Sequence, residues 1–107
     1  MAGEIVYLKK STNPKKKLMA VIMLPDGTRK TVHFGATGYS DYTIHKTKKR
    51  MWNYSNRHKA RENWTKSGID TAGFWSKWIL WNKPSLEDSI KHTENKFNIT
   101  IVNQIKK

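Results

Sequence analysis

Residues 18–34 read LMAVIMLPDGTRKTVHF, and this stretch decides the fold because it predicts a β-hairpin. A continuous apolar run over residues 18–24 leads into Pro25-Asp26-Gly27. Proline fixes the first central φ of a turn, aspartate favours the second position, and glycine supplies a positive φ. Apolar and polar residues then alternate over residues 28–34, which indicates a strand with one buried face. We therefore expect two paired strands with Gly27 in a left-handed conformation.

The segments on either side of the hairpin predict two further strands and three helices, all within one domain, residues 1–107. Short alternating patterns lie near both ends of the chain, and helical spacing of apolar residues fills the middle. This order favours an α+β fold in which a small antiparallel sheet packs against three helices. The expected elements are the strand and hairpin of residues 1–34, a basic helix 43–62, an aromatic helix 71–82, an amphipathic helix 85–97 and a strand 98–105.

Start signals support each expected helix. Asp41 or Thr43 is placed to cap the first helix, and Asp70 or Thr71 to cap the second. Ser85, with an acidic residue three positions later, resembles the capping box that opens many helices. Ser67-Gly68 ends or separates the first helical region, and Asn82-Lys83-Pro84 is placed to stop the second helix.

The chain is strongly basic, with 21 Lys and Arg against eight Asp and Glu, a formal net charge of +13. Residues 1–61 hold 14 of the basic and three of the acidic residues, so the N-terminal part is the expected binding half. Such a charge favours anionic partners. The absence of cysteine excludes disulfides, thiolate metal sites and thiol nucleophiles. No stretch approaches the roughly 20 apolar residues of a membrane span, and we expect no secretory signal.

The expected basic helix is the first candidate binding site. It carries seven Lys or Arg between Lys46 and Arg61 and no acidic residue. Neutralised phosphates release counterions, so a row of cations suits nucleic acid, and an acidic protein surface would suit it as well. The alternative is a solvated polar face without a partner. The residues expected to bind anions are Lys46, Lys49, Arg50, Arg57 and Arg61, reinforced by the loop residues Lys15, Lys16 and Lys17.

The second candidate is the aromatic segment 74–81, FWSKWILW. On a helix its apolar residues occupy nearly the whole circumference, which is typical of a helix buried in its own core or in a partner. Base stacking is disfavoured because stacking platforms usually carry interleaved cations, and this segment has one. The residues expected in the core or at a partner contact are Phe74, Trp75, Trp78 and Trp81.

Nothing in the sequence predicts catalysis or a bound cofactor. The four histidines show no H-x-x-x-H pair, and the carboxylates are scattered without the spacing that a metal site needs. Gly35-Ala36-Thr37-Gly38 lacks the glycine pattern and the following lysine of a phosphate-binding loop. We therefore expect a non-enzymatic protein with no metal and no cofactor, and a small enzyme such as a nuclease is the least favoured alternative.

Several motifs together resemble a known family. They are Val32-His33-Phe34-Gly35, Gly38-Tyr39-Ser40-Asp41-Tyr42-Thr43-x-His45-Lys46, Arg57-His58, Glu62-Asn63-Trp64 and Thr71-Ala72-Gly73-Phe74-Trp75-Ser76-x-Trp78-x-Leu80-Trp81-Asn82-Lys83-Pro84. This pattern is similar to a family of small basic proteins of nucleocytoplasmic large DNA viruses, of the chlorovirus, mimivirus and marseillevirus kind. The similarity extends over roughly residues 29–97, and Thr47 and Lys77 stand where that family has an acid and an arginine.

The resemblance implies a viral protein of the particle, present in many copies, in the virion and in the host cytoplasm or virus factory during assembly. Combined with the charge, it favours a minor capsid or cementing protein that bridges acidic viral capsid proteins. The alternative is a DNA-binding protein without sequence preference that condenses or packages the genome.

Overall fold

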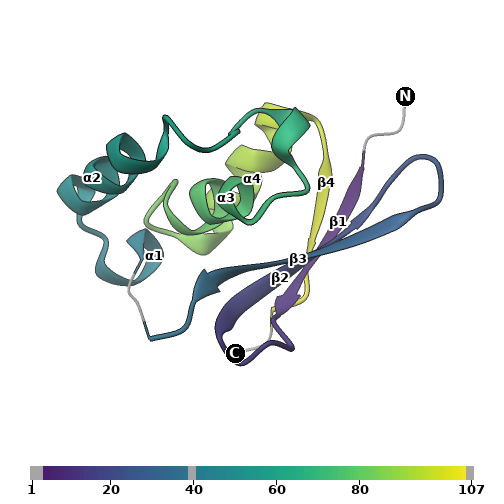
Figure 1. Ribbon diagram of the computed structural model, residues 1–107, viewed down its shortest axis with the longest axis horizontal. Coiled ribbons are helices and arrows are strands. Elements are labelled where there is room, and N and C mark those ends of the chain that lie inside the picture. The colour runs from purple at the N-terminus through teal and green to yellow at the C-terminus, as the bar shows by residue number, and fades with distance from the viewer. Residues whose placement is uncertain (1–3, 39–40, 106–107) are drawn as a thin grey trace.

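The structure, a computed structural model, describes residues 4–38 and 41–105, and it places a four-stranded sheet under a layer of helices (Figure 1). The α+β class expected from the sequence is confirmed. The strands lie in the order β3-β2-β1-β4. The elements are β1 (Ile5–Lys10), β2 (Lys16–Met23), β3 (Arg29–Ala36), α1 (Tyr42–His45), α2 (Lys48–His58), the 3-10 turn η1 (Lys66–Gly68), α3 (Ala72–Trp75), the π-helical turn η2 (Ser76–Leu80), α4 (Leu86–Phe97) and β4 (Thr100–Asn103).

The expected hairpin is confirmed as β2 and β3, and it sets the buried face of the sheet. The strands pair antiparallel, with Leu18 opposite Phe34 and Ala20 opposite Val32. Gly27 has a φ of 92°, as the Pro-Asp-Gly turn predicts. Because side chains alternate along a strand, one face is apolar and lies toward the helices. The buried residues of the first three strands are Val6, Leu8, Leu18, Ala20, Ile22, Val32 and Phe34.

The fourth strand differs from the expectation of an antiparallel sheet. β4 pairs parallel with β1, with Val6 opposite Ile101, so the sheet is mixed. A parallel pair needs a long crossover, and here the connection from β1 to β4 passes through every other element described. No hairpin turn therefore fixes the direction of β4. Its direction follows from α4, which ends at Asn98 in a left-handed conformation (φ 54°).

The expected basic helix 43–62 is two helices instead of one. α1 ends at Lys46, which has a φ of 56°, and α2 begins only at Lys48 and ends at His58. The Lys46 side chain donates from Nζ to the carbonyl oxygen of Pro84 (2.7 Å), a contact 38 residues away in sequence. This long-range hydrogen bond accompanies the break between α1 and α2, and no glycine or proline in the sequence predicts a break there. Asp41 caps α1, as one of the two expected caps.

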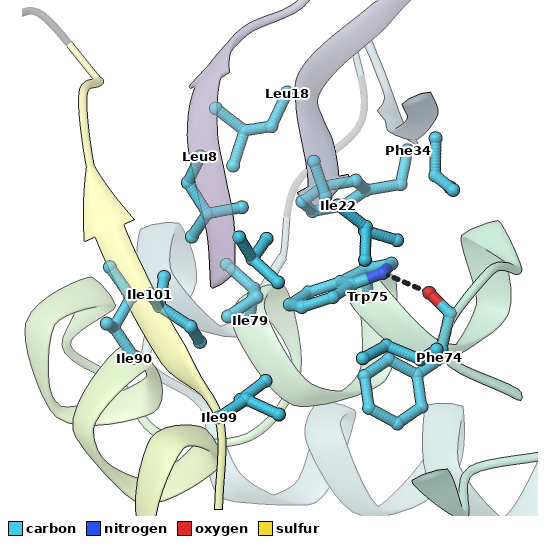
Figure 2. Close-up of a cluster of buried hydrophobic side chains, with 14 of the residues drawn as sticks. Leu8, Leu18, Ile22, Phe34, Phe74, Trp75, Ile79, Ile90, Ile99 and Ile101 are labelled. Atoms are coloured by element: carbon cyan, nitrogen blue, oxygen red, sulfur yellow. Dashed lines mark hydrogen bonds between the residues drawn. The ribbon is translucent and has the colours of Figure 1, made fainter. Parts of the chain in front are cut away.

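The aromatic segment fills the core between the sheet and the helical layer. Thr71 caps α3 by accepting a hydrogen bond from the backbone N–H of Phe74, and the segment then widens into the π-helical turn η2. Figure 2 shows Trp75 among the strand residues, where its Nε1 donates to the carbonyl oxygen of Ile69 (2.6 Å). Phe74 and Trp75 are both 0% exposed. The interpretation of this segment as core within the same chain thus holds for these two residues.

The amphipathic helix α4 closes the other side of the core. Ser85 caps it by accepting from the backbone N–H of Asp88. Two buried hydroxyls fasten it to the preceding segments: Ser89 Oγ bonds both backbone groups of Lys83, and Thr93 Oγ1 donates to the carbonyl oxygen of Trp78 (3.2 Å). Among the described residues, no helix has the length and apolar content needed to span a membrane.

The core position of Trp75 gives a first prediction. Trp75→Ala should lower the free energy of unfolding by about 3–5 kcal/mol, because it empties a large buried site and leaves the Ile69 carbonyl without its donor. Urea denaturation measures this change. The matched control is Trp52→Ala: that tryptophan is 62% exposed, so its loss should cost less than about 0.5 kcal/mol. Equal losses for the two variants would contradict the assignment of Trp75 to the core.

Candidate anion-binding cleft

A cleft of about 450 Å³ lies between the sheet, α2 and the aromatic segment. One wall comes from the paired ends of the hairpin, where Lys16 lies opposite Ala36. The facing wall is formed by α2, and Leu80 and Trp81 contribute apolar surface. Gly35 is required here because its φ is +77° and a Cβ would lie 2.6 Å from Leu80 Cδ1. The cleft thus joins three segments that are far apart in sequence.

Four of the cations predicted to bind anions line this cleft, and three of them, Lys16, Arg50 and Arg57, form no ion pair among the described residues. Arg50 and Arg57 are seven residues apart, so two turns of α2 bring them to the same side of the helix. Both arginines are exposed, and Lys16 is half-buried. In residues 4–38 and 41–105, no carboxylate forms an ion pair with any of the three. Their charges are therefore available to an anionic ligand.

Lys17 also lines the cleft but is already paired. Its Nζ lies 2.6 Å from Oδ2 of Asp41, whose side chain is 3% exposed. Asp41 in addition accepts from the backbone N–H of Thr43 (2.9 Å) at the start of α1. Breaking a buried pair from one side leaves an uncompensated charge, which is costly. The pair therefore ties β2 to α1, and Lys17 already has an anionic partner within the chain.

The remaining predicted cations lie outside the cleft. Lys46 is held at the carbonyl oxygen of Pro84, so its Nζ already has an acceptor. Lys15 is exposed on the turn before β2, and Arg61 is exposed beyond the end of α2. Lys49 is exposed on another side of α2. The single row of cations expected from an unbroken helix is thus divided between different surfaces.

A stack of rings holds α2 against the aromatic segment. The Tyr54 ring lies parallel to that of Trp81, with an interplanar angle of 2° and centroids 4.3 Å apart, and it also stacks on His58 at 4.3 Å. Burial, reinforced by the negative charge of Glu62, raises the pKa of Tyr54 to about 12. The hydroxyl therefore stays protonated at neutral pH, and Tyr54 adds no charge to the lining of the cleft.

Glu62 is the second carboxylate that lines the cleft, besides Asp41. Its Oε2 lies 3.6 Å from Nδ1 of His58, an ion-pair distance when the histidine is protonated. Glycine at position 73 leaves room for this carboxylate, because a Cβ there would overlap with Oε1 of Glu62. Glu62 supplies an acceptor at the side of a cleft whose other charged residues are mostly cations. A ligand with both an anionic group and a donor would match this arrangement.

Lys77 provides the second link between α2 and the core. Its Nζ donates to Ser55 Oγ (3.0 Å) and lies over the rings of Trp64 (5.2 Å) and Trp78 (5.5 Å). Burial lowers the pKa of Lys77 below its usual value. Cation–π contact and the hydroxyl acceptor compensate part of the lost hydration. Lys77 is consequently a structural cation, unlike Arg50 and Arg57.

The predicted aromatic residues divide into two groups. Phe74 and Trp75 are fully buried, whereas Trp78 and Trp81 are half-buried. Trp78 donates from Nε1 to the carbonyl oxygen of Trp64 (3.0 Å), which leaves its indole without a free donor. Trp81 borders the cleft and carries the Tyr54 stack. The segment therefore both fills the core and shapes the candidate site.

Three residues of these surfaces, Tyr54, Glu62 and Trp52, were not predicted from the sequence. The stack of Tyr54 on Trp81 joins residues 27 positions apart, which no local pattern indicates. Trp52 is 62% exposed on α2 and lies on the side that carries Lys49. A tryptophan within a run of cations was a usable signal for Trp52, because aromatic residues that do not serve the core are enriched at binding surfaces. In the part of the chain that is described, no cluster of three His, Asp or Glu could hold a metal ion.

Comparison with known proteins adds one match. Residues 6–58 match a family of unknown function (DUF5754). The matched segment is just under half of the chain, and it contains β1 from its second residue, β2, β3, α1 and α2, with Lys16, Arg50 and Arg57. It ends before the aromatic segment. No curated protein and no solved structure matches the chain.

His45 makes the junction of α1 and α2 sensitive to acid. The backbone N–H of Thr47 donates to His45 Nδ1 (2.9 Å), so protonation of Nδ1 would break this bond. The Nε2 atom is buried and has no hydrogen-bond partner among the described residues. Burial, with a smaller contribution from the positive charge of Arg50, lowers the pKa of His45, and Asp41 opposes this shift. The folded protein therefore favours neutral His45.

This shift gives a prediction for the pH dependence of stability. The unfolded chain takes up a proton on His45 near its ordinary pKa of 6.5, before the folded chain does, so unfolding is favoured as the pH falls through 6.5. His92, whose pKa is also lowered by burial, acts in the same direction. The melting temperature should fall from neutral pH to about pH 5. The fall should be smaller in His45→Gln/His92→Gln, and an identical fall in both proteins would contradict these assignments.

Proposed function

We propose that this chain is a non-enzymatic structural protein that bridges anionic neighbours, with one neighbour bound in the cleft. The observation that carries the proposal is the convergence of Lys16, Arg50 and Arg57 on one cleft without paired carboxylates among the described residues. The chain has a formal net charge of +13, so gathering unpaired cations in one cleft destabilises the fold by electrostatic repulsion. An anionic partner would relieve this repulsion.

The shape of the cleft favours an acidic segment of a neighbouring protein. A guanidinium group binds a carboxylate through two parallel hydrogen bonds, so Arg50 and Arg57 suit Asp or Glu side chains. Glu62 offers an acceptor to the backbone N–H groups of such a segment. A DNA duplex offers phosphates to the same two exposed arginines, but it has no backbone N–H donor for Glu62.

The resemblance to small basic proteins of large DNA viruses supports a setting for this role. In that setting the protein would be a minor capsid or cementing protein, with acidic viral capsid proteins as partners and many copies in the particle. It would be found in the virion, and in the host cytoplasm or virus factory during assembly. Many of the residues that carry the resemblance border the cleft, among them Gly35, Arg57, Glu62, Gly73 and Trp81.

A second candidate function is condensation or packaging of the viral genome by binding DNA without sequence preference. The observation that favours it is the composition of α2, which contains four Lys or Arg and no acidic residue. Its cations Lys48 and Lys49 are exposed away from the cleft. A phosphate backbone would engage this surface irrespective of base sequence.

One triple variant tests the role of the cleft. Lys16→Gln/Arg50→Gln/Arg57→Gln should weaken binding to an oligoglutamate peptide more than about tenfold at low salt, because each lost charge-assisted hydrogen bond is worth roughly 1.5–3 kcal/mol before rearrangement. Fluorescence anisotropy measures the affinity. The control, matched in charge, is Lys10→Gln/Arg29→Gln/Lys91→Gln, whose residues are exposed outside the cleft. It should bind the peptide within about threefold of the wild type.

The same proteins separate the two candidate functions. For duplex DNA, the slope of log K against log salt should fall in magnitude by about 2–3 only if the three cleft cations contact phosphate. Loss of peptide binding with an unchanged DNA slope supports the cementing role. DNA binding that keeps its salt slope in the cleft variant, with no detectable peptide binding by the wild type, supports genome packaging through the surface of Lys48 and Lys49. Equal effects of the two triple variants would contradict a specific role for the cleft.

A further inference from the structure

The side of α2 that carries Lys49 bears an exposed tryptophan in a polar setting. Trp52 is 62% exposed, although tryptophan has the largest apolar surface of any side chain. It shares a shallow hollow with four other side chains of the same helix, and it is the one apolar member of that group. The hollow is lined by Lys48, Lys49, Trp52, Asn53 and Asn56.

Trp52 has no structural task that explains its exposure. The links of α2 to the core come from other residues: Tyr54 stacks on Trp81, and Ser55 accepts from Lys77. α2 has no buried residue, so Trp52 is not part of a docking face. Within residues 4–38 and 41–105, Lys48 forms no ion pair with a carboxylate, and neither does Lys49. The hollow therefore combines a free indole face with two free ammonium groups.

The neighbours of Trp52 identify the chemistry of its partner. A protein hot spot or a membrane surface would require further apolar side chains beside the indole, and the hollow contains none. Charge complementarity instead requires an anion, and the indole requires a flat apolar face. Unpaired nucleotides have both, because every base has a π-face and every linkage a phosphate.

We propose that Trp52 is a stacking platform for an unpaired base of single-stranded nucleic acid. Lys48 and Lys49 neutralise the phosphates on either side of that base, and Asn53 and Asn56 offer hydrogen bonds to its edge. From residue 48 to residue 56 the helix rises by about 12 Å, which is room for about three stacked nucleotides. The site is separate from the cleft, so it does not depend on what occupies the cleft.

The test compares oligo(dT), which remains unpaired, with a duplex of the same length, both fluorescently labelled and titrated with the full chain at low salt. Trp52→Ala should weaken oligo(dT) binding roughly tenfold and leave duplex binding within twofold, because a duplex offers no free base face. Trp52→Phe should retain most of the affinity, since phenylalanine also stacks. The matched control is Ile44→Ala, which removes an apolar residue of similar exposure (60%) from α1 and should change neither affinity.

A second measurement does not depend on the alanine variant. Oligo(dT) should quench part of the intrinsic tryptophan fluorescence of the wild type, and Trp52→Phe should lose that quenching while still binding. Unchanged oligo(dT) affinity in Trp52→Ala would overturn the proposal, as would an equal loss for oligo(dT), the duplex and inorganic polyphosphate. Quenching that persists in Trp52→Phe would overturn it as well. The triple variant of the cleft should keep the Trp52-dependent quenching, so a failure of either proposal is recognised separately.

Discussion

The buried indole of Trp75 is the contact on which the other elements depend. Its ring fills the space between the sheet and the helical layer near Phe34, and its Nε1 donates to the Ile69 carbonyl at 2.6 Å (Figure 2). A buried donor without an acceptor would cost more than the bond contributes, so ring and carbonyl fix each other's position. The position of Trp75 thus fixes α3 and η2 on the sheet, and Trp81 follows directly after η2. Trp81 in turn carries Tyr54, and through it α2 and one wall of the cleft.

The helix that carries the candidate sites, α2, is therefore attached to the core along one face and is not buried. α2 is fastened by a ring stack and by the Lys77 hydrogen bond, and it contributes no buried residue to the core. Such an element lies at the low-stability end of a domain, because few apolar contacts oppose its local opening. This arrangement lets four cations remain in water on α2, at a distance from the compact core. It also makes α2 the segment whose stability would rise most when an anion binds.

The sequence predicted the elements whose causes are local. The turn Pro25-Asp26-Gly27 specified the hairpin, and the caps Thr71 and Ser85 specified two helix starts, because backbone preference and capping act within a few residues. The break at Lys46 was not predictable in this way, since it accompanies a bond to Pro84. The parallel direction of β4 likewise follows from the path of the whole chain. The cations of the cleft were predicted individually, but their convergence depends on the same long-range packing.

The division of cation types around α2 gives the helix two chemically different sides. Arg50 and Arg57 lie toward the cleft, where their planar guanidinium groups can pair with carboxylates. Lys48 and Lys49 lie beside Trp52. Their compact ammonium groups on flexible side chains suit the phosphates on either side of the base that is proposed to stack on the indole. At 100° per residue, positions 50 and 57 point within about 20° of each other, whereas position 52 points about 140–160° away. Because α2 is held to the core along one face only, it can present a different side to each of two partners. This is the geometry that a bridging protein requires.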